Sequence, residues 1–442
     1  MHIVIACSSL CTSRGGSERA ATNLANAMTE RGHRVTLLSL SSAPGNDTLL
    51  YPLHRQVRHL AWDNSGRHEQ LRRLRERLQA DGADVFLSMQ SSSDHLLWSM
   101  VCMGSGIPFI CSERCDPVRY TEQRVWNRPG RLAVLSGADV IHELLPSYAE
   151  SVPSCFKDRV RVIPNAAPVD VKLTHPEARP HERPILLFLA RFDGQKRPLL
   201  LIDAFRMAVV NHPEWELHMW GHGPLEKAVR ARIARCGLEA KAHMRGECKD
   251  TPAAYAEAQL YCLPSAYEGL PNTALEAMSA GLPVVGFKEC AGIREVVREG
   301  ETGLVVAEST PEALARALDA LMGDGDLRWR MGQTAMQEAR TYNPEAVNTQ
   351  WESLFMELAA KKGHTVMDAF FAEPFASRAR LSAAARREWL FRNFGEPMPY
   401  GSRWFLLHCA TLFRNAACHL LDKLKTLRGP HLPGEISRAG KM

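Results

Sequence analysis

The chain contains 442 residues, of which 45% are hydrophobic and 23% charged, with a formal net charge of +5 at pH 7. Its length exceeds the size at which one hydrophobic core keeps growing, so two domains are expected in an ordinary soluble globular protein. The segment from Met1 to Ser9 lacks the basic region and long apolar core of a signal peptide. No uninterrupted apolar stretch approaches the roughly 18 residues of a membrane-spanning helix, so a cytoplasmic location is expected.

The first half alternates apolar runs with helical patterns. Glu18–Arg31 is one such helix, and the pair Gly15-Gly16 precedes it. The apolar runs predict strands at His2–Cys7, Arg34–Leu40, Asp84–Met89, Pro108–Cys111, Asp139–Ile141 and Arg159–Pro164. This alternation is typical of an α/β protein with a doubly wound parallel sheet. The polar, proline-rich stretch Val169–Arg183 is interpreted as a linker to a second domain.

The second half repeats the pattern, beginning with a buried strand predicted at Pro184–Ala190. Arg191 and Lys196 follow this strand at its C-terminal end, which is the edge where open α/β sheets bind ligands. Two cations fixed at that edge would meet the negative charge of a diphosphate.

The stretch from Glu268 to Glu276 contains two carboxylates separated by a turn of Gly, Pro and Asn. The turn predicts a helix start with Asn272 or Thr273 as the N-cap, so Glu268 lies in the preceding loop and Glu276 about one turn inside the helix. Free backbone N–H groups at a helix start face an anion. Carboxylates also recur at this spacing on solvated helices, so the pair alone leaves that interpretation open.

Taken in order, these segments resemble the retaining glycosyltransferases of family 4, in particular those that build bacterial polysaccharides and lipid-linked glycans. The resemblance covers roughly residues 1 to 360. The matching motifs are Gly15-Gly16-Ser17-Glu18-Arg19, Gly32-His33-Arg34-Val35, Val162–Asn165, Arg191 with Lys196, Trp220–Pro224, Glu268–Glu276, Ala280–Pro283 and Gly303–Val306. The ordered set is more specific than any one of its members.

The resemblance implies the GT-B fold, in which two Rossmann-like, doubly wound parallel-sheet domains face a cleft. On this pattern an N-terminal acceptor-binding domain spans residues 1–170, and a C-terminal domain that binds the nucleotide sugar spans residues 183–344. A helix at about residues 345–361 is expected to cross back to the first domain. Residues 363–442 lie outside the resemblance and are predicted to form a basic helical extension.

The resemblance also implies retaining transfer of a hexose or N-acetylhexosamine from a nucleoside-diphosphate sugar to a glycan or polyprenyl-linked acceptor, in polysaccharide or lipopolysaccharide biosynthesis. UDP is adopted only because it is the commonest donor nucleotide in such relatives. No metal and no cofactor are implied, since Arg191, Lys196 and the helix start would stabilise the departing diphosphate. The one Asp-x-Asp motif, Asp324 to Asp326, lies between helical patterns and suits a solvated turn.

By the family pattern, Glu268 lies beside the donor sugar, Glu276 accepts hydrogen bonds from the ribose hydroxyls, and Gly16 lets the backbone approach the phosphate. The catalytic residues implied are Arg191, Lys196 and Glu268. The donor-binding residues implied are Gly16, Gly269, Leu270, Asn272, Thr273 and Glu276. No enzymic nucleophile is implied, because the leaving phosphate is thought to accept the acceptor proton on the same face.

The acceptor side departs from the common pattern of the family. Many relatives have a histidine after the fourth strand of the first domain, whereas this chain has Ser112-Glu113-Arg114. A similar loop occurs in relatives that build polysaccharides, so Glu113 and Arg114 are placed at the acceptor or the donor sugar. A salt-bridged loop is the alternative interpretation.

Twelve cysteines are scattered along the chain, which indicates a reducing compartment. Cys7 with Cys11, and Cys111 with Cys115, each follow a predicted strand, and their four sulfurs could converge on a metal. The spacing is not the usual two-residue gap, so small apolar fillers at strand ends are favoured.

The extension from residue 363 to 442 holds twelve Lys or Arg and six Asp or Glu, which leaves the rest of the chain close to neutral, with 42 basic and 43 acidic residues. One apolar helical face is predicted from Leu406, Ala410, Phe413, Ala417, Leu420, Leu424 and Leu427. The helix could lie on the cytoplasmic face of an inner membrane, pack on the protein or pair in a dimer. Membrane docking would suit a lipid-linked acceptor.

The sequence also bears on other possible partners and functions. Nucleic acid is disfavoured because the basic residues lack an aromatic stacking surface or a known recognition module. A dehydrogenase is disfavoured because neither half has a complete Gly-x-Gly-x-x-Gly after its first strand. The alternative retained is a non-catalytic GT-B protein that binds a nucleotide or glycan as a regulator or scaffold.

Overall fold

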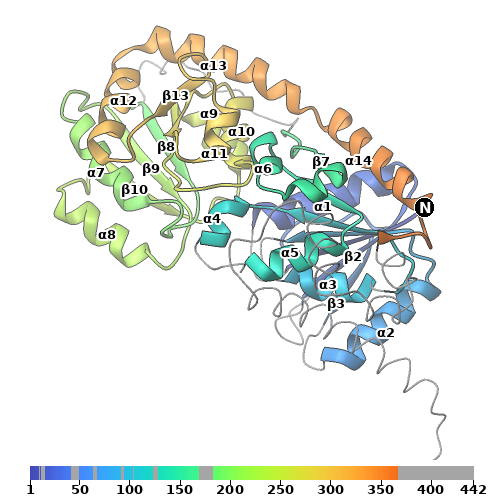
Figure 1. Ribbon diagram of the computed structural model, residues 1–442. Helices are drawn as coiled ribbons and strands as arrows, with labels where there is room; N and C mark the ends of the chain where they lie inside the picture. The colour runs from blue at the N-terminus through green and yellow to red at the C-terminus, as the bar shows by residue number, and fades with distance from the viewer. Residues whose placement is uncertain are drawn as a thin grey trace, which may run out of the picture.

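A computed structural model of the protein describes residues 1–8, 10, 15–40, 49–62, 67–90, 94–102, 104–122, 128–168 and 183–366. Within these residues the chain forms two lobes, each built around a parallel sheet with helices on both faces (Figure 1). The two sheets follow one another in the chain, and a long helix near the end of the described residues runs back to the first lobe.

The first sheet has seven strands in the order β3-β2-β1-β4-β5-β6-β7, all parallel. The strands are β1 (His2–Cys7), β2 (Arg34–Leu40), β3 (Arg58–Trp62), β4 (Val85–Gln90), β5 (Phe109–Glu113), β6 (Val140–Glu143) and β7 (Val160–Val162). Strands β1 and β4 are buried along their whole length, because helices cover both faces of the sheet. Their largely apolar sequences follow from that double burial.

Helices pack on the two faces of the first sheet in separate apolar layers. The helices of this lobe are α1 (Gly16–Glu30), α2 (Arg67–Ala80), α3 (Asp94–Cys102), α4 (Pro117–Glu122), α5 (Arg128–Gly137) and α6 (Pro146–Glu150), with a 3₁₀ helix at Ser154–Arg159. α2, α3 and α5 cover one face. α1 covers the other face together with α14 (Pro344–Ala359), whose Trp351 and Phe355 are buried in the core of the first lobe.

The second sheet has six parallel strands in the order β10-β9-β8-β11-β12-β13. The strands are β8 (Ile185–Leu189), β9 (Glu216–Trp220), β10 (Ala242–Gly246), β11 (Leu260–Leu263), β12 (Val284–Phe287) and β13 (Gly303–Val306). In both sheets the chain runs outward from the first strand and then returns to continue on its other side. This doubly wound order leaves a switch point between β1 and β4, and another between β8 and β11, where such sheets bind ligands.

The helices of the second lobe also divide between two faces. They are α7 (Pro198–Ala208), α8 (Glu226–Arg235), α9 (Thr251–Glu257), α10 (Asn272–Ser279), α11 (Ala291–Val296), α12 (Pro311–Gly323) and α13 (Gly325–Ala339), with a 3₁₀ helix at Arg340–Tyr342. α7, α8 and α12 cover one face, whereas α9, α10, α11 and α13 cover the other. Leu144, Leu145 and Tyr148 of the first lobe join this second layer, so the two lobes are packed directly against one another.

The prediction of two doubly wound parallel sheets is confirmed. Strand β3 was not predicted, because this edge strand is mostly half-exposed and has no continuous apolar run. The interpreted linker at 169–182 and the basic extension from residue 367 onward lie outside the described residues, so the predictions about them stay predictions. None of the helices in the described part of the chain is both long and apolar enough to cross a membrane.

Candidate active site

The switch point of the second sheet brings two loops together. One loop leaves β8 at Ala190 and the other leaves β11 after Leu263, and the two strands are hydrogen-bonded neighbours. Gln195 ties the loops to each other: its backbone carbonyl accepts a hydrogen bond from the Ala266 N–H at 2.8 Å, and its side-chain amide donates to the Tyr267 carbonyl at 2.8 Å. The predicted catalytic residues lie on these two loops.

Lys196 and Glu268 face each other across the switch point. The Lys196 ammonium lies 2.5 Å from a Glu268 carboxylate oxygen, and both side chains are largely buried. Burial alone would lower the pKa of Lys196, but the Glu268 carboxylate raises it above its ordinary value, so the ammonium stays charged at neutral pH. Arg197, next in the chain, has φ of +49°, a sparsely populated conformation for a residue other than glycine.

Arg191 lies apart from this pair in the described structure. Its side chain is 65% exposed, and its guanidinium is 3.5 Å from an Asp193 carboxylate oxygen. The two cations predicted at this edge therefore differ: Lys196 is fixed by a carboxylate, whereas Arg191 is on a solvent-exposed side chain that is free to turn toward a ligand.

The start of α10 differs from the prediction in one respect. Pro271 occupies the N-cap position and no side chain caps the helix, so the expectation that Asn272 or Thr273 would do so is wrong. The Asn272 side chain is used elsewhere: its Oδ1 accepts a hydrogen bond from Asn165 of the first lobe at 2.7 Å. The Thr273 carbonyl accepts a hydrogen bond from the Tyr255 hydroxyl at 3.2 Å.

Glu276 is buried one turn inside α10, and both of its oxygens have partners. Oε1 forms an ion pair with Arg19, which lies in the first turn of α1, three residues after Gly16. Oε2 accepts a hydrogen bond from the Tyr255 hydroxyl at 3.0 Å. The carboxylate predicted to hold a ribose is thus reached by a cation from the other lobe.

Two of the predicted donor-binding glycines lie where the lobes meet. The Gly16 carbonyl is 3.4 Å from the Asn272 side-chain nitrogen, which donates to it. A Cβ added to Gly269 would lie 2.4 Å from the Arg114 carbonyl oxygen, so only glycine permits this approach of the two backbones. Leu270, the next residue, is buried among apolar side chains of the second lobe.

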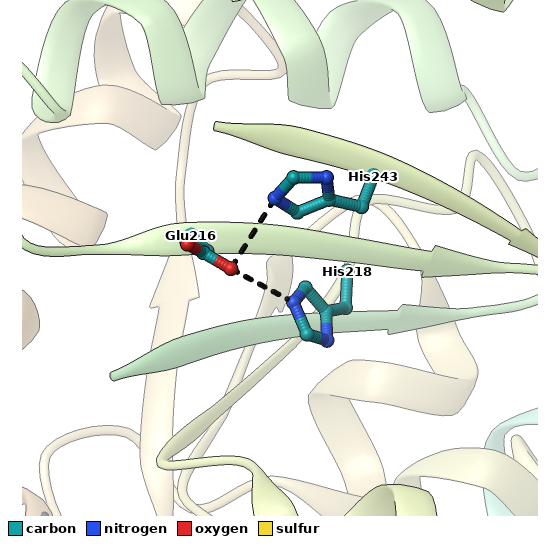
Figure 2. Close-up of side chains that lie close together, drawn as sticks. All are labelled: Glu216, His218 and His243. Carbon is teal, nitrogen blue, oxygen red and sulfur yellow. Dashed lines mark hydrogen bonds and ion pairs between the residues drawn. The ribbon is translucent and has the colours of Figure 1, made fainter. Parts of the chain in front are cut away.

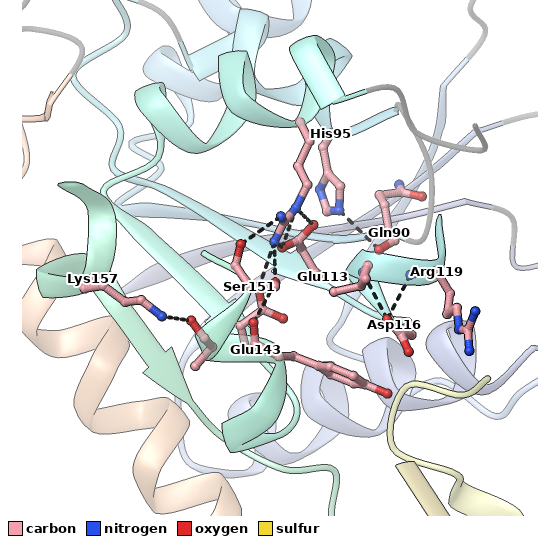
Figure 3. A network of polar contacts seen from close by, with 12 residues as sticks. Gln90, His95, Glu113, Asp116, Arg119, Glu143, Ser151 and Lys157 are labelled. Carbon is pink, nitrogen blue, oxygen red and sulfur yellow. Dashed lines mark hydrogen bonds and ion pairs between the residues drawn. The ribbon is translucent and has the colours of Figure 1, made fainter. Parts of the chain in front are cut away.

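Glu113 lies in a buried ionic cluster at the end of β5 (Figure 3). Arg131 binds its carboxylate in two places, with Nε 2.8 Å from Oε1 and Nη2 2.7 Å from Oε2. The same guanidinium is 3.8 Å from Glu143 at the end of β6. Burial would raise the pKa of Glu113, but the Arg131 guanidinium holds it below its usual range, while burial and the neighbouring Glu113 raise the pKa of Glu143 well above its own. This geometry favours the salt-bridged interpretation for Glu113.

Arg114 points toward the boundary between the lobes. Its guanidinium donates a hydrogen bond to the Asn165 side chain, and burial lowers its pKa to about 10. A pocket of about 350 Å³ adjoins it between α1, α14 and residues 164–168. Arg19, Asn165 and Glu276 also line this pocket. Of the two residues assigned to the acceptor or donor sugar, Arg114 is the one near the space between the lobes.

Sequence reasoning did not assign roles to Arg19, Tyr148, Asn165 and Tyr255, which all contact the predicted site. The Tyr148 hydroxyl of the first lobe donates a hydrogen bond to the Glu268 backbone carbonyl. Arg19 and Asn165 fall within motifs that carried the family resemblance, which was the available signal. Nothing in the local sequence around Tyr148 or Tyr255 marks them.

The cysteine cluster considered from the sequence does not form among the described residues. Cys7, Cys111 and Cys115 are buried thiols, and Cys11 lies outside the described part of the chain. Among described side chains, the one group of three potential metal ligands consists of Glu216, His218 and His243. The buried cysteines pack as small side chains in the described core, and the Cys7 thiol also donates a hydrogen bond to the Leu38 carbonyl at 3.7 Å.

Comparisons with known proteins agree with the two-lobe geometry. The model of the family described as Glycosyltransferase Family 4 matches residues 14–171, and that described as Glycosyl transferases group 1 matches residues 172–338. Among solved structures, the fold resembles that of Anabaena HepE in complex with UDP and glucose, with a TM-score of 0.69 and 17% identity over 81% of this chain and 100% of that one.

Characterised bacterial proteins are also similar in sequence. An N-acetylgalactosaminyltransferase of Campylobacter jejuni, which acts on a diphospho-undecaprenol-linked glycan, is 23% identical over 78% of this chain and 96% of its own length. An exopolysaccharide phosphotransferase of Streptomyces coelicolor is 32% identical, but the match covers 58% of this chain and only 27% of that protein.

The fold and the switch-point site define a two-domain transferase of the GT-B type. The chain belongs to the group 1 glycosyltransferases of family 4.

Proposed function

We propose that this protein is a retaining, metal-independent transferase that moves a hexose or N-acetylhexosamine from a UDP-sugar to a glycan or polyprenyl-linked acceptor in cell-surface polysaccharide biosynthesis. The observation that carries the proposal is the Lys196–Glu268 pair across the switch point, with Glu276 close by on α10. The bacterial relatives in surface glycan synthesis, and the UDP in the HepE structure, support the donor and acceptor classes.

The charges of the site suit a diphosphate leaving group. When the bond between the anomeric carbon and the diphosphate oxygen breaks, positive charge develops on the sugar ring and negative charge on the phosphates. The Lys196 ammonium and the free N–H groups at the start of α10 would stabilise the phosphates, and Arg191 would turn from solvent to add a second cation. Preorganised charges of this kind lower the barrier without a metal ion.

Glu276 would hold the ribose through hydrogen bonds from its hydroxyls. Its present partner Arg19 would then release the carboxylate and move toward the diphosphate, because both partners lie at the boundary between the lobes. Glu268 would lie beside the donor sugar and keep Lys196 in place. The acceptor hydroxyl would attack on the face that the diphosphate leaves, and its proton would pass to the departing phosphate oxygen. No enzyme nucleophile is needed for retention by this route.

The acceptor would approach from the first lobe. Arg114 is the residue we assign to the acceptor or donor sugar, with Asn165 fixing its guanidinium. Glu113 would not contact the sugar, because its carboxylate is bound by Arg131 at the end of β5; its role would be to support the loop that carries Arg114. The basic extension beyond residue 366 is proposed to dock on an anionic inner-membrane surface, which would bring a polyprenyl-linked acceptor to this lobe.

The test is transfer by the purified full chain. UDP-glucose, UDP-galactose, UDP-N-acetylglucosamine and UDP-N-acetylgalactosamine are supplied in turn with a polyprenyl-diphosphate-linked glycan, with and without EDTA. UDP release and sugar incorporation into lipid are measured, with Glu268→Ala as the variant of low turnover. Incorporation of one sugar that persists in EDTA is the expected result.

Two other outcomes contradict parts of the proposal. Loss of transfer in EDTA, restored by a divalent ion, would overturn metal independence. Tight UDP binding with no transfer to any acceptor and no slow hydrolysis would instead favour a non-catalytic nucleotide-binding protein.

A further inference from the structure

A group of three potential metal ligands lies on the second sheet, outside the proposed active site. Glu216 and His218 are on β9, and His243 is opposite His218 on the neighbouring strand β10. Residues two apart on a strand point to the same face, so Glu216 and His218 share one side of the sheet. Figure 2 shows both imidazole rings turned toward the Glu216 carboxylate.

Two of the three separations between the ligand atoms match those around a tetrahedral metal ion. Nε2 of His218 and Nε2 of His243 each lie 3.2 Å from the same Glu216 oxygen, Oε2. The three atoms all lie within 4.8 Å of one another. Zinc binds His nitrogen and carboxylate oxygen at about 2.0–2.2 Å, and two ligands at the tetrahedral angle are then about 3.3 Å apart. Both distances to Glu216 fit that value.

The hydrogen bonds around the group leave the right lone pairs available. Arg183 donates a hydrogen bond to the other Glu216 oxygen, Oε1, at 2.9 Å. Oε2 therefore faces the two imidazole rings. The Arg245 guanidinium lies 3.0 Å from Nε2 of His218. A guanidinium can only donate, so this contact needs a lone pair on Nε2, as metal binding does. The same Nε2 lies 3.2 Å from the Glu216 Oε2, which can only accept, so without a cation Nε2 can satisfy only one of its two neighbours.

We propose that Glu216, His218 and His243 bind one zinc-like divalent transition-metal ion, with water completing a tetrahedral site. Two imidazoles and a carboxylate form a donor set that selects zinc over magnesium or calcium, which prefer oxygen ligands. Arg245 is exposed on the edge strand, so it can swing away as the ion enters.

The position of the site indicates a structural role. Glu216 is the first residue of β9, whereas the switch-point loops leave the opposite, carboxyl ends of the strands. A metal held by β9 and β10 would fasten the edge strand β10 to the sheet. The bound ion is therefore predicted to raise thermal stability and to leave sugar transfer unchanged.

The test uses the metal-stripped full chain. Zinc is titrated by calorimetry, Co²⁺ is added as a spectroscopic probe, and Mg²⁺ is the ion expected not to bind. One zinc per chain is expected, with a rise of about 2–5 °C in the unfolding temperature at saturation. Co²⁺ should give the intense visible bands of a four-coordinate site without thiolate charge-transfer absorption in the near ultraviolet.

Matched variants locate the ion. His243→Ala and His218→Ala should each weaken zinc binding by more than about 100-fold, the upper range for a change outside the ligand shell. His212→Ala is the control, because His212 is a similarly buried histidine of the same lobe that pairs with Asp319 instead. Arg245→Gln should tighten zinc binding about 10-fold, since it removes a positive charge beside the ion.

Tighter zinc binding by Arg245→Gln would distinguish a metal site from a cluster held together by hydrogen bonds alone. In such a cluster, the substitution would only remove the hydrogen bond between Arg245 and His218. His243 is partly exposed, so its variant is expected to fold, and circular dichroism checks this. Absence of stoichiometric zinc binding would overturn the proposal. So would zinc binding that survives both histidine variants, or thiolate absorption in the Co²⁺ spectrum.

Discussion

Both sheets carry buried cation–carboxylate groups at the carboxyl ends of their strands, and the two groups differ in how their partners are supplied. In the first lobe, Arg131 donates hydrogen bonds to both carboxylate oxygens of Glu113, and both residues belong to one domain. In the second lobe, Lys196 makes one contact with Glu268, and Glu276 takes its cation from the other lobe. The carboxylate of the first group is paired entirely within its own domain. The carboxylates of the second group are paired through loops and through the other lobe, and a ligand can replace these contacts.

The difference shows that burial and charge do not by themselves mark an active site. Glu113 is at least as deeply buried as Glu268; Glu113 is the last residue of β5, and Glu268 lies in the loop that follows β11. What separates them is the topology, because only Glu268 lies at a switch point with a single-contact partner on the neighbouring loop. The following predictions test this contrast between a structural and a reactive ion pair.

The largest effect is expected for Glu268→Ala. Removing the carboxylate frees Lys196 from its position and takes a charge from beside the donor sugar, so kcat should fall about 1,000-fold with KM little changed. Steady-state UDP release measures this. Glu312→Ala, an exposed carboxylate in the first turn of α12, is the control and should leave kcat unchanged. A rise in KM with kcat unchanged would instead assign Glu268 to donor binding alone.

A loss of stability is expected for Glu113→Gln. The change leaves the Arg131 guanidinium buried without its charged partner, which costs about 3–5 kcal/mol. Thermal unfolding should detect a large decrease in the melting temperature. Glu143→Gln is the comparison, measured near the ordinary glutamate pKa of about 4.3: burial holds that carboxyl in its neutral form, so a neutral amide should there change stability by less than about 1 kcal/mol. Equal losses in the two variants would contradict the assignment of the charge to Glu113.

A smaller, functional effect is expected for Glu276→Ala. Loss of the hydrogen bonds to the ribose hydroxyls should raise KM for the donor about 10-fold, while kcat stays within a few-fold of the wild type. Tyr255→Phe, which removes the hydroxyl that orients Glu276, should move KM in the same direction by less. A fall in kcat equal to that of Glu268→Ala would contradict the assignment of Glu276 to donor binding and Glu268 to turnover.

The smallest effect concerns pH. The pKa of Glu143 is raised in the folded protein, because burial and then Glu113 disfavour its charged form. Its contribution to stability is therefore full below the unfolded pKa and is lost as pH rises through the folded value. Relative to wild type, Glu143→Gln should gain stability as pH rises from the ordinary glutamate pKa of about 4.3 toward the raised folded value, by up to about 1.4 kcal/mol per pH unit. Parallel melting curves of the two proteins across this range would contradict the prediction.

Most of the fold was predictable because its strands are buried on both faces. Runs such as His2–Cys7 and Pro184–Ala190 are continuously apolar, and this pattern together with the intervening helices indicates parallel sheets. Strand β3 escaped prediction because it is a partly exposed edge. The N-cap of α10 was wrong because Asn272, a good capping residue in isolation, bonds Asn165 across the boundary between the lobes.

The site was predictable where a motif carried it and not where partners are distant in sequence. The assignments of Lys196, Glu268 and Glu276 came from a strand end and from motifs that resemble the family's, whereas the contact of Glu276 with Arg19 joins residues 257 positions apart. Glu113 was placed at the sugar because its loop follows a strand. Its partner Arg131 comes from α5, and no spacing rule connects the two.

Lys196 is the residue proposed to bind the phosphates of a nucleoside diphosphate. The most direct measurement is calorimetric titration of UDP, GDP and ADP into wild type, Lys196→Ala and the control Lys157→Ala, all in EDTA. We predict one UDP site in the wild type and in Lys157→Ala, weakened at least about 10-fold by Lys196→Ala through loss of a charge-assisted hydrogen bond. Equal UDP affinity in all three proteins, or no binding of any nucleotide without a metal ion, would contradict the account.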